Sequence, residues 1–351
     1  MAAQTSINII VGIISLFISL VGTLGNLLTI VGFYYAKHKR RYKFHENWRS
    51  SIIYIINLSV IDFFFCACIQ IQVFAALSFV SYENGHRIYH DPDSLWCTFS
   101  THSQIFFGIL DSSAIALISL TRAFALTNNS QWELICEKKR YVSTFIAFPW
   151  IFSILLYFPA FGHVFARDVA TGFCYPKIHA SWYVENIRYI IHGTSAIAIL
   201  FSYCYIYFYV SKYSKEQNKF NLNSANSKSI HSRNVQIAKT MAIVSFSSIV
   251  LMLPWSVVQI LHASHMITPE TYSLLHVVTY AILILQYSIN MFIYVWRKDA
   301  YTKAIMDVVY IFLPNFIRKR RRNIDRNTIA SFKSRTNATK SNVMQENDVV
   351  K

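Results

Sequence analysis

The stretch SLWCTFSTHSQIFFGILDSSAIALISLTR, residues 94–122, decides the fold class of this chain. From residue 94 to residue 121 its only Lys, Arg, Asp or Glu is Asp111, and Arg122 follows at once. About 20 apolar residues in a helix cross a hydrocarbon layer of roughly 30 Å, so the stretch can span a membrane. Because lipid offers no hydrogen-bond partner to the backbone, the stretch is predicted to be a helix.

Six further stretches have the same length and character. Between them they contain only Asp62 and Lys212 as charged residues, and they cover residues 1–36, 50–82, 141–166, 189–213, 240–269 and 271–296. Strands of a membrane barrel would be shorter and would alternate apolar and polar residues, a pattern that is absent here. The sequence therefore predicts an all-α membrane protein, a bundle of seven transmembrane helices.

The composition supports this class. Of 351 residues, 54% are hydrophobic and only 14% are charged, whereas soluble domains carry about 25% charged residues. These values exclude a disordered chain, a collagen-like chain and an ordinary cytosolic enzyme. Six cysteines are also too few for a disulfide-stapled scaffold.

The net charge of +16 comes from basic residues that gather on one side of the predicted membrane. All Lys and Arg fall in segments that would share one face, except Arg87, Arg167, Lys177 and Arg188. Because cytoplasmic loops carry the excess of Lys and Arg, we expect the N-terminus outside the cell and the C-terminus in the cytoplasm. The charges flank spans and form no single stripe, so a nucleic-acid partner is not expected.

The predicted organisation has four parts. A short extracellular N-terminus covers residues 1–6, and the seven-helix transmembrane domain covers residues 7–297. Residues 298–313 are expected to form an amphipathic helix on the membrane surface, with Ile305 and Val308 on its apolar face. Residues 314–351 form a basic, polar cytoplasmic tail whose Ser and Thr residues could be kinase targets or plain linker.

Polar and special residues inside the spans narrow the class further, because such residues are costly in lipid and usually functional. In chain order they are Gly25-Asn26, Asn57 and Asp62 in NLSVID, Cys97 and Arg122, Trp150, Pro254 in LMLPW, and Asn290 and Tyr294 in NMFIY. In this order and on these spans they make the chain resemble the rhodopsin-like (class A) G-protein-coupled receptors. The resemblance implies a receptor, not an enzyme, that binds an extracellular ligand and activates a heterotrimeric G protein at the cell membrane. Arrestin, a receptor kinase and membrane lipids are further expected partners.

A disulfide between Cys97 and Cys174 is expected at the outer face. Cys97 starts the third span and Cys174 lies in the outer loop before the fifth, so both would face the oxidising compartment. Two free thiols remain the alternative.

Two lone acids mark the middle of the bundle. The resemblance implies that Asp62 helps to hold a sodium ion, with Asn26 and Asn290 as partners. Asp111 stands where the family commonly has Ser, so two carboxylates would face one small space. Either a cation lies between them or one of them holds a proton. Local pairing of Asp111 with Asn or Ser side chains is the structural alternative.

The resemblance also implies a cytoplasmic switch at Arg122. Thr121 replaces the usual acidic neighbour, so the resting lock on Arg122 should be weak. Pro254 should kink its helix, and Tyr205 and Tyr294 are expected to close on the interior during activation. The alternative is that Arg122 is one more positive residue at the inner surface.

Candidate ligand contacts lie in the outer half of the bundle. They are Gln104, Phe107, Gly108, Trp255, Gln259, His276 and Tyr280. Gln104 stands where amine receptors have Asp, and Ile284 stands where opsins have the retinal-binding Lys, so neither a biogenic amine nor retinal is expected. A small molecule, a lipid or a short peptide remains possible. The departures from the family pattern are typical of divergent orphan or chemosensory receptors.

A cation or proton transporter or channel component is the alternative function, with Asp62 and Asp111 as its relay. Inverted repeats and matching broken helices, which are common in transporters, are absent from the sequence.

Overall fold

The structure is a computed structural model that describes most of the chain. It covers residues 2–38, 46–80, 95–126, 139–157, 165–167, 174–176, 181–220 and 225–297, together with Thr302, Ile305, Met306, Val308 and Val309.

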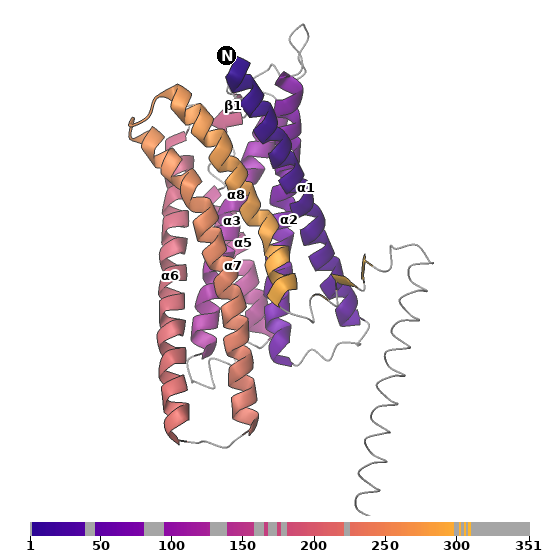
Figure 1. Cartoon of the computed structure of the whole chain (residues 1–351), viewed down its shortest axis with the longest axis vertical. Coiled ribbons are helices and arrows are strands. Elements are labelled where there is room, and N and C mark those ends of the chain that lie inside the picture. The colour runs from indigo at the N-terminus through magenta and orange to yellow at the C-terminus, as the bar shows by residue number, and fades with distance from the viewer. Residues whose placement is uncertain are drawn as a thin grey trace, which may run out of the picture.

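Within these residues, seven long helices lie side by side (Figure 1). They are α1 (Ala2–His38), α2 (Glu46–Val80), α3 (Leu95–Leu126), α5 (Lys139–Tyr157), α6 (Ser181–Phe220), α7 (Ala225–Ala263) and α8 (Pro269–Arg297). Each contains a stretch long and apolar enough to cross a membrane. The predicted seven-helix, all-α bundle is thus confirmed. Helix α1 already begins at Ala2, so residues 2–6 belong to it.

One short sheet accompanies the helices. Strand β1 (Phe165–Arg167) pairs antiparallel with β2 (Cys174–Pro176). The fourth span, expected to run to residue 166, was therefore predicted too long, since α5 ends at Tyr157 and Ala166 is in a strand. Pro159 lies two residues beyond this end. A proline lacks the N–H that a helix needs and disfavours helical backbone in the residue before it.

Helices α3 and α8 form the centre of the bundle. In each, 67% of the span is buried, against 22% for α5. Helix α3 contacts α2, α5, α6 and α7, while α8 contacts α1, α2 and α7. Helices α6 and α7 touch each other only sparsely.

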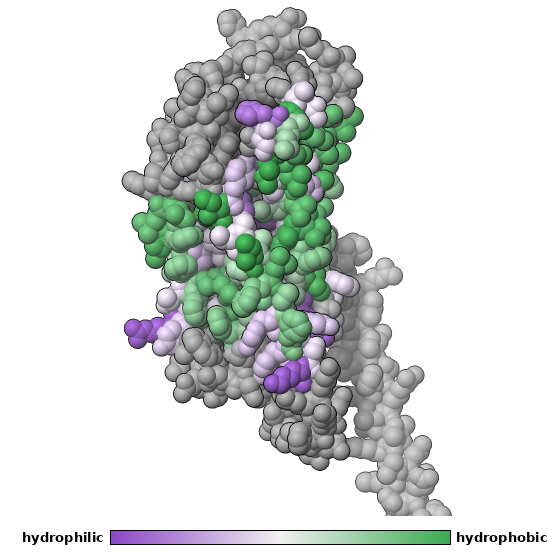
Figure 2. Space-filling model, turned by 90° about the vertical axis from the view of Figure 1, so that its left-hand side faces the viewer, coloured by the Kyte–Doolittle hydropathy of each residue, from purple (hydrophilic) through white to green (hydrophobic). Residues whose placement is uncertain are grey.

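Large apolar side chains cover the outside of the bundle. Phe17, Leu155, Ile197, Phe201 and Phe208 are each at least two-thirds exposed. The face on the α6 side is apolar across its middle and more polar toward both ends (Figure 2). A soluble protein rarely exposes so large an apolar surface, so this surface is the one that meets lipid.

Helix α1 sits very close to α8 and α2. A Cβ placed on Gly22 would collide with Ser288 Oγ and would lie 2.7 Å from Cys66 Sγ. The amide of Asn26 donates to the Tyr287 carbonyl at 2.9 Å, and Gln70 donates to Thr23 Oγ1 at 2.6 Å. Glycine at position 22 lets these polar contacts form at short range.

A tight turn joins α7 to α8. His265 lies in it with φ of 55°, and its N–H donates to the His262 carbonyl at 3.0 Å. Left-handed backbone is uncommon outside glycine and closes this helix end abruptly. The outer ends of α7 and α8 are therefore held together.

Of the predicted surface helix 298–313, the structure describes five positions, all helical. Ile305 and Val308 are buried, with exposed fractions of 7% and 1%. The backbone of Ile305 lies next to Gly32 of α1. The extent of this helix remains a prediction.

The contact at Gly22 gives a stability test. Gly22→Ala should lower the melting temperature of the purified protein, because overpacking of a filled core costs about 1–3 kcal/mol. Gly193→Ala is the matched control, since a Cβ there meets nothing within 4 Å. Thermal unfolding in detergent measures both. Equal melting temperatures for the two variants would contradict the close packing of α1.

Candidate functional site

The polar centre of the bundle contains both predicted acids. Asp62 of α2 and Asp111 of α3 are 0% and 1% exposed. Asn290 Nδ2 donates to Asp62 Oδ2 at 2.8 Å, and Gln286 Nε2 donates to Asp111 Oδ2 at 2.9 Å. Each acid is therefore held by one amide of α8.

Asn26 is buried beside this centre but does not bond to either acid. Its amide nitrogen donates to the Tyr287 backbone carbonyl, which ties α1 to α8. Of the predicted set Asn26, Asp62, Asp111 and Asn290, the structure thus pairs Asp62 with Asn290 directly.

Five buried amide and carboxylate oxygens at this centre have no hydrogen-bond partner among the described residues. They are Asn26 Oδ1, Asp62 Oδ1, Asp111 Oδ1, Gln286 Oε1 and Asn290 Oδ1. All are acceptors, and an unmatched acceptor in a buried site is expensive. Such a set suits a cation or an added proton.

Gln286 was not among the predicted site residues. It precedes Asn290 by four positions and so lies on the same helix face. That spacing was the signal in the sequence that could have identified it.

A second group of polar and aromatic side chains lies toward the end of the bundle that the charge pattern predicts to be the outer one. Tyr280 of α8 donates its hydroxyl hydrogen to Gln104 Oε1 of α3. The His276 ring stacks on the Tyr280 ring, with centroids 5.7 Å apart. Tyr272 contacts His276 and donates to Gln259 Oε1 of α7 at 3.3 Å. We call Gln104, Gln259, Tyr272, His276 and Tyr280 the outer cluster.

The outer cluster joins four of the predicted ligand contacts. Trp255, a fifth, is 5% exposed and packs in the same apolar cluster as Tyr280. Tyr272 was missed, although it lies four residues before His276 on α8.

The two remaining candidates face other helices. Phe107 stacks on Phe64 of α2, with ring centroids 5.6 Å apart, and meets Trp150 of α5 edge-on. Gly108 faces Tyr287 and Phe65, whose rings stack at 3.6 Å. Both belong to the packing between helices more than to the outer cluster.

The C-terminal end of α3, which the charge pattern predicts to be its inner end, contains the residues of the predicted switch. Arg122 is only 6% exposed, and its guanidinium lies over the Tyr54 ring, 5.4 Å from the centroid. Among the described residues, its Nε and Nη2 have no hydrogen-bond partner. Thr121 Oγ1 donates to the Ile118 carbonyl at 2.8 Å. Tyr294 is fully buried nearby, in the same apolar cluster as Tyr54.

A hydroxyl network joins three helices near this end. Ser119 Oγ of α3 and Ser245 Oγ of α7 are 3.2 Å apart, and Tyr203 OH of α6 is 3.3 Å from Ser245 Oγ. We call Ser119, Tyr203 and Ser245 the hydroxyl triad. It was not predicted from the sequence.

Tyr205 is 40% exposed and so lies outside the interior in this structure, and its closing on the interior during activation remains a prediction. Two positions on a helix differ by about 200°, so only one of Tyr203 and Tyr205 can point inward. The structure gives that place to Tyr203. Pro254 lies inside α7, which continues on both sides of it.

The predicted disulfide falls at the edge of the described region. Cys97 lies in the first turn of α3 and Cys174 begins β2, and both strands contact α3. The side chains of both cysteines lie outside the described residues, so the bond remains a prediction.

Comparisons with known proteins identify the class. The family model described as 7 transmembrane receptor (rhodopsin family) matches residues 25–296. The chain therefore belongs to the rhodopsin family of seven-transmembrane receptors.

Among solved structures, the crystal structure of squid rhodopsin matches with a TM-score of 0.68 at 18% sequence identity. The match covers 86% of this chain and 85% of that chain. At 18% sequence identity, this similarity shows that the two proteins share a fold and nothing more. A search of curated protein sequences gives no match.

If the hydroxyl triad restrains α7, its removal should let the inner ends of α3 and α7 separate more often. Ser245→Ala removes the hydroxyl that contacts both Ser119 and Tyr203. Each lost bond contributes about 0.5–1.5 kcal/mol, so separation of the inner ends of α3 and α7 should become several-fold more frequent. Energy transfer between dyes at positions 124 and 239, attached through introduced azido amino acids, measures that separation.

Ser247→Ala is the matched control, because Ser247 bonds only to the Val244 carbonyl of its own helix. If both variants leave the distance distribution unchanged, the triad does not restrain α7.

Proposed function

We propose that this protein is a class A G-protein-coupled receptor of the cell membrane, with its N-terminus outside and its C-terminus in the cytoplasm. An extracellular ligand binds at the outer cluster, and the inner end then activates a heterotrimeric G protein. One observation carries the proposal, the column of polar side chains through the apolar bundle. It runs from Gln104 and Tyr280 through Asp111 and Gln286 to the buried Arg122.

The outer cluster favours an uncharged ligand that forms hydrogen bonds. Its members present amide, imidazole and phenol groups, and no carboxylate stands among them to pair with an amine. Ile284 is fully buried and apolar, so no lysine is available there to bind retinal. A small polar molecule, a lipid or a short peptide fits this chemistry.

The polar centre is the proposed link between the two ends. The unpartnered oxygens of Asn26, Asp62, Asp111 and Asn290 fit a sodium ion as ligands. A bound sodium ion would offset the repulsion between the two acids and hold α2, α3 and α8 together. Membership of the receptor family does not favour the alternative of a cation transporter.

The described polar contacts that hold the inner end of α7 to its neighbours are between neutral hydroxyl groups. Hydrogen bonds between neutral groups contribute about 0.5–1.5 kcal/mol, against about 1.5–3 kcal/mol when one partner is charged. We therefore infer elevated basal activity. When the inner end of α7 moves away, the Arg122 guanidinium becomes free to contact a G protein.

The remaining proposals concern the periphery. A Cys97–Cys174 bond would hold the β1–β2 sheet against α3. Phosphorylation of the tail by a receptor kinase would recruit arrestin, and the helix that contains Ile305 would lie on the inner leaflet.

The function is tested by basal nucleotide exchange. The receptor in lipid vesicles should accelerate guanine-nucleotide exchange on at least one class of G protein, and Arg122→Ala should abolish this. Arg140→Ala is the matched control, because Arg140 is an exposed arginine of α5. No exchange with any class, with or without a library of uncharged ligands, contradicts the proposal.

The cation proposal is tested by stability. A ligand at about ten times its Kd stabilises the folded state by about 1.4 kcal/mol. Sodium chloride should therefore raise the melting temperature relative to N-methylglucamine chloride at equal ionic strength.

Asp111→Ser should remove this sodium dependence. Ser113→Ala should keep it, because Ser113 bonds only to the Ile109 carbonyl of its own helix. A variant Asp111→Ser with an undiminished sodium shift contradicts a shared site.

A further inference from the structure

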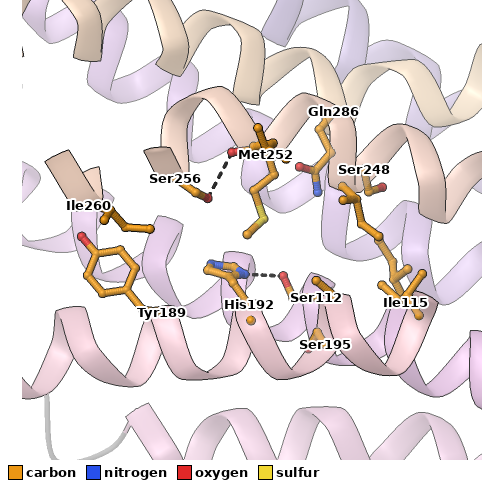
Figure 3. Close-up of a pocket in the computed structure, with 15 residues that line it drawn as sticks. Ser112, Ile115, Tyr189, His192, Ser195, Ser248, Met252, Ser256, Ile260 and Gln286 are labelled. Atoms are coloured by element: carbon orange, nitrogen blue, oxygen red, sulfur yellow. Dashed lines mark hydrogen bonds between the residues drawn. The ribbon is translucent and has the colours of Figure 1, made fainter. Parts of the chain in front are cut away.

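A cavity of about 250 Å³ lies between α3, α6 and α7, apart from the outer cluster. None of the five residues of the outer cluster lines it. Gln286 of α8 forms its inner wall, and Figure 3 shows that side chain reaching toward the space between His192 and Ser248. The cavity is therefore separate from the outer cluster, and it borders the polar centre at Gln286, which bonds to Asp111.

Small side chains on facing helices create the space. They are Ser112, Gly193, Ser195, Ala196, Ser248 and Ser256. Each of these positions would hold a large apolar residue in a filled interface, since protein interiors are packed as densely as organic crystals. Helices α6 and α7 touch only sparsely, and these small side chains leave the gap between them unfilled.

The cavity opens toward the lipid-facing surface. Leu253 and Ile260, which line it on α7, are 55% and 56% exposed. Gly193, which lines it on α6, is also exposed, and a Cβ there would meet nothing within 4 Å. These residues lie within the membrane spans 189–212 and 239–262, so the mouth faces the bilayer.

The inner wall presents one unsatisfied acceptor. Gln286 is 2% exposed, its nitrogen donates to Asp111, and its Oε1 has no partner among the described residues. Ser112 Oγ and His192 Nδ1 form a hydrogen bond of 2.6 Å beside it. Of the other lining residues, Ser248 and Ser256 donate their hydroxyl hydrogens to carbonyls of their own helix, and most of the surface that the cavity presents is apolar.

An unpaired acceptor in a mostly apolar cavity favours one chemical class of bound molecule. A free acceptor needs a donor, and a donor left unpaired in lipid would be costly. A carboxylate or phosphate head is disfavoured because Asp111 lies directly behind Gln286. An uncharged molecule with a hydroxyl group and an apolar body satisfies both requirements.

We propose that this cavity binds a lipid alcohol, which enters from the bilayer between α6 and α7 and donates its hydroxyl hydrogen to Gln286 Oε1. A cavity of about 150 Å³ holds a benzene-sized molecule, so this cavity accepts the hydroxyl-bearing end while the rest stays in lipid. The occupant would act on Asp111 through Gln286 and would keep α6 and α7 apart. This proposal does not depend on the proposed coupling to a G protein, because the experiment below measures binding of the alcohol itself.

Photolabelling of the full chain in phosphatidylcholine nanodiscs tests the proposal. The probe is a long-chain primary alcohol with a diazirine next to the hydroxyl-bearing end, and its methyl ether is the matched control probe. Mass spectrometry should place adducts within residues 189–199 and 248–260. The alcohol should label roughly three- to tenfold more than the ether, the factor that one net hydrogen bond supplies.

Two variants separate the site from general contact with lipid. Gly193→Phe fills the mouth without a clash and should greatly reduce labelling, whereas Thr194→Phe adds the same ring at an exposed position outside the cavity lining. Gln286→Met should remove the preference for the alcohol over the ether. Competition by unlabelled decanol or by cholesterol distinguishes an aliphatic alcohol from a sterol as the preferred occupant.

Adducts spread evenly over the lipid-facing helices overturn the proposal, as does labelling that Gly193→Phe leaves unchanged. Equal labelling by alcohol and ether overturns the assignment of the hydroxyl to Gln286. These results are independent of nucleotide exchange, so failure of the receptor proposal would be seen separately.

Discussion

Lipid offers no hydrogen-bond partner, so every polar side chain inside this bundle must find its partner within the protein. The structure meets this constraint mainly through α8, which provides the amides for Asp62 and Asp111 and the carbonyl for Asn26. Three helices are thereby fixed to one. Many serines and threonines instead bond to a carbonyl one turn earlier in their own helix, as Ser113 and Ser248 do. Only the hydrogen bonds between different helices fix the positions of those helices relative to one another.

The same constraint gives meaning to the buried polar atoms that have no hydrogen-bond partner. Five unpartnered amide and carboxylate oxygens gather around the two acids, and two guanidinium nitrogens of Arg122 have no partner among the described residues at the inner end. Groups of this kind are costly in a resting bundle, so each favours a second arrangement in which a partner is supplied. In the proposed function, a cation or proton is that partner in the centre, and a G protein is that partner at the inner end. A receptor needs such a difference between its states in order to respond.

The sequence predicted the spans, the family and the buried acids, because charge-poor length and the order of special residues are visible without coordinates. It did not predict Gln286, Tyr203 or Tyr272, since those depend on how each helix is rotated about its axis. For that reason the sequence pointed to Tyr205 and not to Tyr203, since the two residues are of the same type and lie only two positions apart. The cavity also escaped prediction, because a void arises from small residues on helices that are distant in sequence. Phe165 and Ala166 of β1 were assigned to a span because they are as apolar as the residues before them.

The abrupt turn at His265 has a mechanical consequence. Helix α7 is 39 residues long, and at 1.5 Å per residue it forms a rod of roughly 58 Å. Its outer end is joined to α8 by this turn, while its inner half is held by the hydroxyl triad and by Met241 and Val244, which belong to the apolar cluster that contains Tyr54 and Tyr294. A tilt of about 5° around the pinned end would carry the far tip through roughly 5 Å. The protein can therefore amplify an ångström-scale adjustment near Gln259 into a displacement as wide as a helical turn.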